Sequence, residues 1–170
     1  NLMDVDACVR LIDEFEELTY VIVKHNNACG VATGQTAKEA YVQALACDPI
    51  SAFGGVIITN ANVDAAVAEE LHQLFFEILI APSFDEDALV ILKKKKDRRL
   101  LVRKEVKVST KQYRTLLNGV LEQDKDLVTE KTVDFKVATS RAPSDEENKA
   151  MEFALKICKH LSAKTVLLSS

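Results

Sequence analysis

Short runs of apolar, mostly β-branched residues recur along this chain, and segments with helical periodicity separate them. The runs suit strands buried on both faces, because they are too short for typical helices. They occupy residues 20–23, 56–59 and 78–81. The intervening helical segments are residues 4–15, 36–47, 64–75 and 85–94. Strands that alternate with helices predict an α/β fold, in which helices pack on a layered sheet.

Capping signals mark the starts of two helices. Thr36 is followed three residues later by Glu39, and Ser144 is followed in the same way by Glu147. Both pairs match the capping box, in which the two side chains bond each other's backbone N–H groups. The second pair predicts a long amphipathic helix over 144–161.

The second half of the chain is less regular. Further strands are predicted at 100–102, 133–138 and 165–168, and a hairpin is predicted within 104–131. The apolar residues of that hairpin are Leu116, Leu117, Val120 and Leu121. The basic run at 93–96 is interpreted as a solvated helix end, where cations suit the helix dipole. A phosphate-binding role is the alternative.

Composition favours one domain and excludes several classes of protein. The chain has 170 residues, of which 48% are hydrophobic and 28% charged, as in an ordinary globular domain. Its net charge of -4 offers no broad basic field, so nucleic acid and membrane are not expected as partners. No apolar run approaches the roughly 20 residues of a membrane span. The four cysteines lack metal-ligand spacing, which predicts reduced thiols, no metal site and a cytoplasmic protein.

Ionisable and amide side chains follow directly after the first apolar run. Lys24 and His25 come first, then Asn26 and Asn27, with Gly30 shortly after. Side chains alternate along a strand, so the Lys–His pair serves one site only if the strand breaks there, which the asparagines and the glycine allow. The imidazole takes up protons near neutral pH, and a neighbouring ammonium disfavours its protonation. The alternative is a strand end with polar residues and no function.

Two further segments are candidates for ligand contact. The loop at 48–55 has glycines before a strand, so a ligand can approach its backbone at Gly54 while Phe53 packs on a flat ring. The alternative is a structural turn with Phe53 in the core. Glu77 stands beside the third apolar run, where its carboxylate would accept from a hydroxyl or amine. The alternative there is an exposed helix end.

Four segments together resemble the family of 5-aminoimidazole-4-carboxamide ribonucleotide (AICAR) transformylases. They are Val-Ile-Val-Lys-His-Asn-Asn-Ala-Cys-Gly-Val-Ala at 21–32, Asp-Pro-Ile-Ser-Ala-Phe-Gly-Gly at 48–55, Glu-Ile-Leu-Ile-Ala-Pro at 77–82 and Arg-Thr-Leu-Leu-Asn-Gly-Val-Leu-Glu-Gln-Asp at 114–124. They occur in the family's order and nearly span the chain. The combination is therefore more specific than any one motif.

The resemblance implies formyl transfer from 10-formyltetrahydrofolate, a co-substrate, to the 5-amino group of AICAR in purine biosynthesis. Lys24 and His25 would be the catalytic pair: the histidine takes a proton from the amine, and the lysine stabilises charge on the formyl group or the leaving folate nitrogen. The implied substrate contacts are Asn27, Phe53, Gly54 and Glu77.

The family also implies an architecture. Its transformylase domain has two related halves, each a three-layer α/β/α sandwich resembling the cytidine deaminase-like fold, and it works as a homodimer. Residues 1–170 would form the first half as a single domain, without the deaminases' zinc ligands. The second half and a cyclohydrolase domain would lie elsewhere in a longer protein, so the isolated piece is expected to be inactive.

Several departures from the family pattern matter. The chain lacks an initiator Met and an upstream nucleotide motif, which predicts a fragment. Ala28 replaces a common Pro. Ala163 and Lys164 align with a Ser-Asn pair whose Asn assists the catalytic His, and an ammonium cannot accept a hydrogen bond as an amide can. The alternative function is therefore a non-catalytic nucleotide-binding or dimerisation module.

Overall fold

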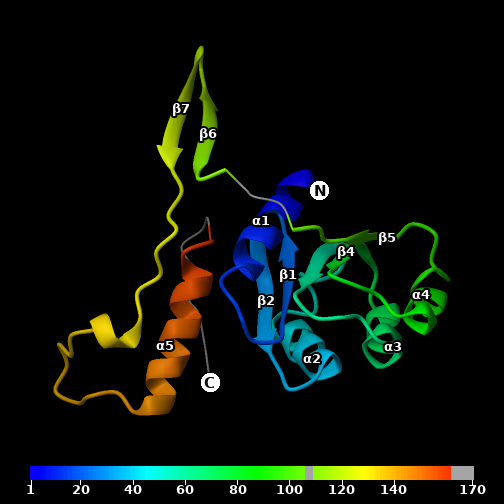
Figure 1. Ribbon diagram of the computed structural model, residues 1–170, viewed down its shortest axis with the longest axis horizontal. Helices are drawn as coiled ribbons and strands as arrows, with labels where there is room; N and C mark the ends of the chain where they lie inside the picture. The colour runs from blue at the N-terminus through cyan, green and yellow to red at the C-terminus, as the bar shows by residue number, and fades with distance from the viewer. Residues whose placement is uncertain (106–108, 162–170) are drawn as a thin grey trace.

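The computed structural model describes residues 1–105 and 109–161 (Figure 1). Its centre is a five-stranded mixed sheet with the order β2-β1-β3-β4-β5. The strands are β1 Thr19–Lys24, β2 Asn27–Thr33, β3 Gly55–Thr59, β4 Phe76–Ala81 and β5 Arg99–Val102. β1 runs antiparallel to both of its neighbours, whereas β3, β4 and β5 are parallel. The carboxyl end of β1 therefore lies beside the amino ends of β3 and β4.

Helices cover both faces of this sheet and form a three-layer α/β/α arrangement. One face carries α1 (Leu2–Ile12) and α5 (Asp145–Cys158). The other carries α2 (Ala37–Cys47), α3 (Ala65–Gln73) and α4 (Glu86–Leu92). The expected α/β class with helical layers is confirmed. Within the described ranges, no helix combines the length and apolarity that crossing a bilayer requires.

The side chains of β1 are buried on both faces of the sheet, as expected of a central strand. Val21 and Val23 face the cluster beneath α1, while Tyr20 and Ile22 face the cluster beneath α2. All four side chains are at most 1% exposed. Burying each one stabilises the fold by roughly 1.5–3 kcal/mol. A strand packed on both faces is apolar at successive positions, as the run at 20–23 predicted.

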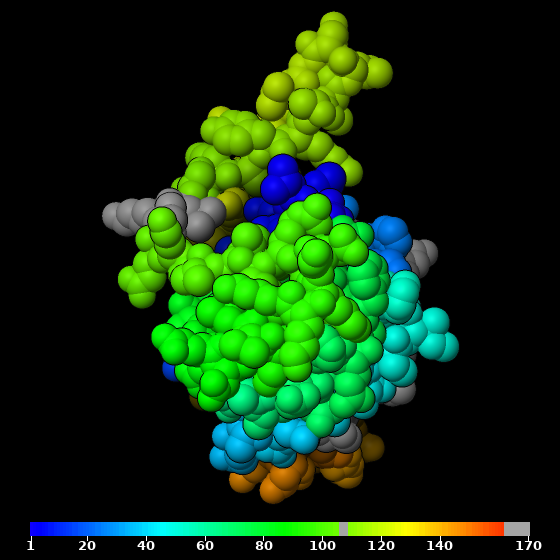
Figure 2. Space-filling model, turned by 90° about the vertical axis from the view of Figure 1, so that its right-hand side faces the viewer, coloured from blue at the N-terminus to red at the C-terminus, as the bar shows by residue number. Residues whose placement is uncertain are grey.

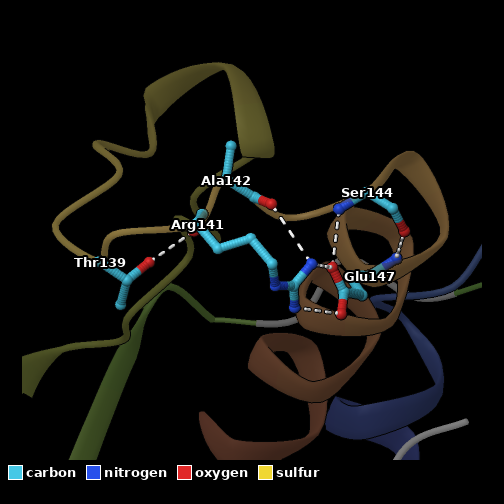
Figure 3. Close-up of polar contacts among 5 residues, drawn as sticks. All are labelled: Thr139, Arg141, Ala142, Ser144 and Glu147. Carbon is cyan, nitrogen blue, oxygen red and sulfur yellow. Dashed lines mark hydrogen bonds and ion pairs between the residues drawn. The ribbon is translucent and has the colours of Figure 1, made fainter.

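Both expected helix starts are capped, but only Ser144 and Glu147 form the full capping box; at Thr36 the Glu39 carboxylate accepts from the N–H of Gln35 at 2.9 Å instead. The Thr36 hydroxyl accepts from the backbone N–H of Glu39 (3.1 Å). At the start of α5, Ser144 and Glu147 form the reciprocal capping box (Figure 3). Arg141 adds two hydrogen bonds to the same carboxylate, at 2.8 and 2.7 Å. These bonds lower the pKa of Glu147 to about 2.

An ion-pair cluster ties α5 to the loop after α1. The Glu14 carboxylate contacts the Lys159 ammonium at 2.9 Å and the His160 imidazole at 2.7 Å. It also accepts from the Thr129 hydroxyl at 2.9 Å. Together these hydrogen bonds hold the pKa of Glu14 below its ordinary value, against the opposing effect of burial. The two side chains after α5 thus have their partner on another element.

The expected hairpin is confirmed as β6 (Lys111–Leu116) paired with β7 (Gly119–Asp124). It stands clear of the globular body in both views (Figures 1 and 2). Its apolar side chains are exposed, with Leu116 at 50% and Val120 at 64%. The body of the protein therefore does not bury the hairpin.

One expected element is wrong, and one strand of the sheet was not expected. Residues 133–138 are not a strand: a 3-10 turn (Thr132–Asp134) begins there, and the N–H of Thr132 donates to Glu152 of α5 at 2.6 Å. This segment thus bonds a helix side chain and not a neighbouring strand. The sequence also did not predict β2, because its polar and small residues lack the apolar run that marks the other central strands. The strand expected at 165–168 lies outside the described residues.

Gly30 serves close packing inside β2 and not the chain break expected from the sequence. A Cβ at this position would lie 2.0 Å from the carbonyl oxygen of Ala44 in α2. The absence of a side chain lets the α2 backbone pack directly on the strand.

We expect Gly30→Ala to lower the free energy of unfolding by about 2 kcal/mol or more, because helix and strand must separate to admit the methyl group. Gly119→Ala is the matched control, since a Cβ there meets no atom within 4 Å. Urea denaturation of both variants checks the difference. Equal stability of the two would contradict the close approach.

Arg98 closes the carboxyl end of α3 from within the core. Only 8% of the residue is exposed. Its Nη2 donates to the carbonyls of Leu71 (3.2 Å), His72 (3.0 Å) and Leu74 (2.6 Å). The guanidinium also lies 4.3 Å from the centroid of the Phe76 ring. A cation here satisfies carbonyls that the helix end leaves without intrahelical partners.

Arg98→Met should therefore lower the free energy of unfolding by about 3 kcal/mol, since the charge-assisted bonds disappear and buried carbonyls lose a donor. The neighbouring Arg99 is exposed. Arg99→Met should change stability by less than about 0.5 kcal/mol. Calorimetry or urea titration distinguishes them, and a harmless Arg98→Met would show that the cap is dispensable.

Candidate functional site

The six residues assigned from the sequence to catalysis and substrate contact lie at one end of the sheet. Because β1 is antiparallel to β3, its carboxyl end lies beside the amino ends of β3 and β4. Lys24 ends β1, His25 follows it, Asn27 begins β2, Phe53 and Gly54 precede β3, and Glu77 is the second residue of β4. Ligands of open parallel sheets usually bind at the carboxyl ends of the strands. Here the antiparallel strand carries its own carboxyl end to the opposite edge.

A tight two-residue turn breaks the chain after Lys24. Lys24 pairs with Asn27, and the two residues between them have positive φ: 55° at His25 and 65° at Asn26. Left-handed backbone at both positions is typical of a type I′ hairpin turn, which most often contains Asn or Gly. The expected break is confirmed, and it falls at the histidine itself.

Lys24 reaches across to the loop before β3. Its ammonium donates to the carbonyl oxygen of Phe53 at 2.5 Å. An ammonium has three donors, and this carbonyl occupies one of them. The contact places a cation at the base of the loop, where it can donate to negative charge on a ligand.

The loop itself is held by its own hydrogen bonds and presents an aromatic ring. The Asp48 carboxylate accepts from the N–H of Ser51 at 3.0 Å, and bonding to Ser51 lowers the pKa of Asp48. The N–H of Gly54, at φ +72°, donates to the carbonyl of Phe75 at 2.8 Å. Phe53 is 58% exposed and its ring lies 5.2 Å from that of Phe75. The alternative that Phe53 belongs to the core is wrong.

Glu77 occupies a β-bulge. Gly55 of β3 pairs with Phe76, and Val56 pairs with Ile78, so Glu77 is the extra residue of β4. A bulge redirects a side chain and is common beside functional sites. The half-buried carboxylate accepts from the side-chain amide of Asn1. The alternative of an exposed helix end is therefore wrong.

A second bulge lies on the other side of β1. Ile22 pairs with Gly30 and Val23 pairs with Ala28, which leaves Cys29 as the extra residue of β2. The thiol donates to the carbonyl of Ile22 at 3.4 Å. Burial raises the pKa of Cys29 to about 11, so the group is a thiol and not a nucleophilic thiolate at neutral pH.

The start of α1 supplies site residues that the sequence did not reveal. A shallow hollow of about 460 Å³ is lined by His25, Asn26 and the first four residues of the chain. Within it, the Asp4 carboxylate accepts from the N–H of Asn26 at 2.6 Å. An acidic residue in a first helical turn ordinarily indicates only a favourable helix dipole. No local pattern connects it with a turn 22 positions further on.

Lys24 and His25 therefore flank the end of β1 from two directions. The lysine contacts the loop before β3, and the histidine lines the hollow beside α1. The described part of the chain contains no group of three or more His, Cys, Asp or Glu side chains suited to a metal ion. Ala163 and Lys164, which align with the assisting Ser-Asn pair, lie outside the described residues.

The left-handed backbone at His25 predicts a gain in stability when the histidine is replaced by glycine. We expect His25→Gly to raise the free energy of unfolding by about 0.5–1 kcal/mol, because glycine adopts positive φ without the Cβ penalty. His25→Ala keeps that penalty and is the control. Urea denaturation measures both, and a Gly variant no more stable than the Ala variant would contradict the proposed penalty of the left-handed backbone.

Sequence comparison assigns this α/β domain to a family of purine enzymes. The sequence model of the AICARFT/IMPCHase bienzyme family matches residues 1–170, so the chain belongs to that family. The assignment agrees with the resemblance seen in the motifs.

Similar proteins carry the name bifunctional purine biosynthesis protein PurH. The protein of Bacteroides thetaiotaomicron is 53% identical over 169 residues, which cover 99% of this chain and 33% of the relative. That of Enterococcus faecalis is 42% identical over 177 residues, covering 100% and 34%. That of Persephonella marina is 43% identical over 172 residues, covering 99% and 33%. The chain thus spans about a third of the length of these relatives.

Proposed function

We propose that this chain is the first half of a transformylase domain and contributes to the transfer of a formyl group from 10-formyltetrahydrofolate to the 5-amino group of AICAR. Family membership supports the assignment to a bifunctional purine enzyme. The observation that carries the proposal is the meeting of Lys24, His25 and the loop ending in Gly54 at one edge of the sheet.

The proposed chemistry uses the two flanking groups separately. The amine nitrogen of AICAR attacks the formyl carbon, and the bond from that carbon to the folate nitrogen breaks. His25 takes the proton that the amine gives up, and the folate nitrogen regains a proton as it leaves. Lys24 stabilises the negative charge that develops on the formyl oxygen or on the leaving nitrogen.

The remaining residues are proposed to bind the two substrates. The exposed Phe53 ring offers a flat surface for a heterocycle, and Gly54 lets a ligand approach the backbone. Glu77, redirected by its bulge, accepts a hydrogen bond from a hydroxyl or amine of the nucleotide. Asn27 adds an amide beside the pair.

The proposal extends to the whole protein. The strand order β2-β1-β3-β4-β5, with β1 antiparallel, supports a cytidine deaminase-like arrangement of this half. We propose that a second half and a second subunit complete the site in a cytoplasmic homodimer, and that residues 1–170 alone do not turn over.

The test measures formyl transfer by the full-length protein that we propose this chain to be part of. His25→Ala should lower kcat by about 10²–10⁴-fold, as expected for loss of a general base. Lys24→Ala should lower it by about 10²–10³-fold through lost charge stabilisation. Lys149→Ala, on the exposed face of α5, is the control and should leave the rate unchanged.

Wild-type rates in His25→Ala would refute the role of the histidine. A full-length protein that binds AICAR in a calorimetric titration but transfers no formyl group would favour the alternative of a non-catalytic nucleotide-binding module.

A further inference from the structure

We propose that Asp4 is a positioning residue that sets the geometry of His25 through the backbone of the turn. The inference rests on the proposed function of His25. Its structural basis is the hydrogen bond from the N–H of Asn26 to Asp4 Oδ1 at 2.6 Å. The carboxylate therefore acts one residue away from the histidine, without contacting the reacting atoms.

The turn needs an external partner because its backbone conformation is unfavourable. His25 and Asn26 both have positive φ, and neither is glycine. Such conformations persist where surrounding contacts enforce them, and they concentrate at functional sites. A carboxylate bonded to the turn's own N–H is one of the strong, charge-assisted contacts that can do so.

Asp4 is itself held rigidly. It lies in the first turn of α1, whose buried residues Ala7, Cys8 and Leu11 pack on the sheet. Its side chain is only 17% exposed. The helix therefore presents the carboxylate from a fixed position, as precise placement of a general base requires.

Asp6 shows what an ordinary carboxylate of this helix looks like. It is exposed and pairs with Arg10 four residues later at 3.1 Å, a surface contact. Such pairs contribute little to stability. Asp6 shares the helix and residue type of Asp4 but does not contact the turn, so it is the matched control.

The first experiment measures steady-state formyl transfer by the full-length protein. Asp4→Ala should lower kcat about 10–100-fold, because a displaced general base loses its alignment. KM for AICAR should change by less than about threefold, because the proposed binding contacts remain. Asp4→Asn retains an acceptor oxygen and should recover most of the rate. Asp6→Ala should behave as wild type. An unchanged kcat in Asp4→Ala, or an equal loss in Asp4→Asn, would overturn the inference.

The second experiment does not depend on activity. Amide hydrogen exchange should show the Asn26 N–H losing protection at least tenfold in Asp4→Ala and not in Asp6→Ala. The Val21 amide should stay protected in every variant, which verifies that the sheet remains folded. Undiminished protection of Asn26 in Asp4→Ala would overturn the inference.

A double variant separates this inference from the proposed function. If Asp4 acts through the histidine, Asp4→Ala should add less than about twofold to the loss in His25→Ala. A further tenfold loss would mean that Asp4 acts independently and would overturn the inference. If His25→Ala alone keeps the wild-type rate, the proposed function fails, while the exchange result still reports on the contact.

Discussion

The antiparallel pairing of β1 with both β2 and β3 determines where everything else in this domain lies. A strand parallel to β3 would deliver Lys24 and His25 to the far edge, beside the carboxyl ends of β3 and β4. Because β1 runs the other way, its last residue lies beside the loop before β3 and the bulge of β4. The tight turn into β2 then places the histidine against the start of α1. One choice of strand direction thus gathers groups from four elements.

Buried contacts at the end of α3 support the loop before β3, which lies at the same end of the sheet as Lys24. Few other residues could replace Arg98, because its guanidinium donates hydrogen bonds to three carbonyls at the end of α3. The last of these carbonyls belongs to Leu74. The next residue, Phe75, accepts the N–H of Gly54 and packs on the ring of Phe53. The segment that Arg98 caps is therefore bonded, through Phe75, to the loop proposed to hold the substrates. Changes to that cap are expected to disturb the site as well as the core.

The sequence predicted those parts of the domain whose cause is local. Apolar runs marked β1, β3 and β4 because a doubly buried strand has no polar face, and the caps at Thr36 and Ser144 depend on neighbours three residues away. The sequence did not predict the strand β2, because the close approach of the α2 backbone, and not strand propensity, requires a glycine at position 30. The contact of Asp4 and the bulge at Glu77 were not predicted for a related reason: each depends on an element distant in sequence.

The two hairpins of the described residues, β1–β2 and β6–β7, face different constraints on length over evolutionary time. The turn at His25 and Asn26 fixes the register of β2 against β1, so an inserted residue would shift that pairing and pull the histidine from α1. The tip of β6 and β7 has an equally short connection, but this hairpin stands away from the central sheet (Figure 1) and Leu117 at its tip is fully exposed. Within this domain, insertions and deletions are therefore expected to accumulate at that tip and to be purged from the first turn.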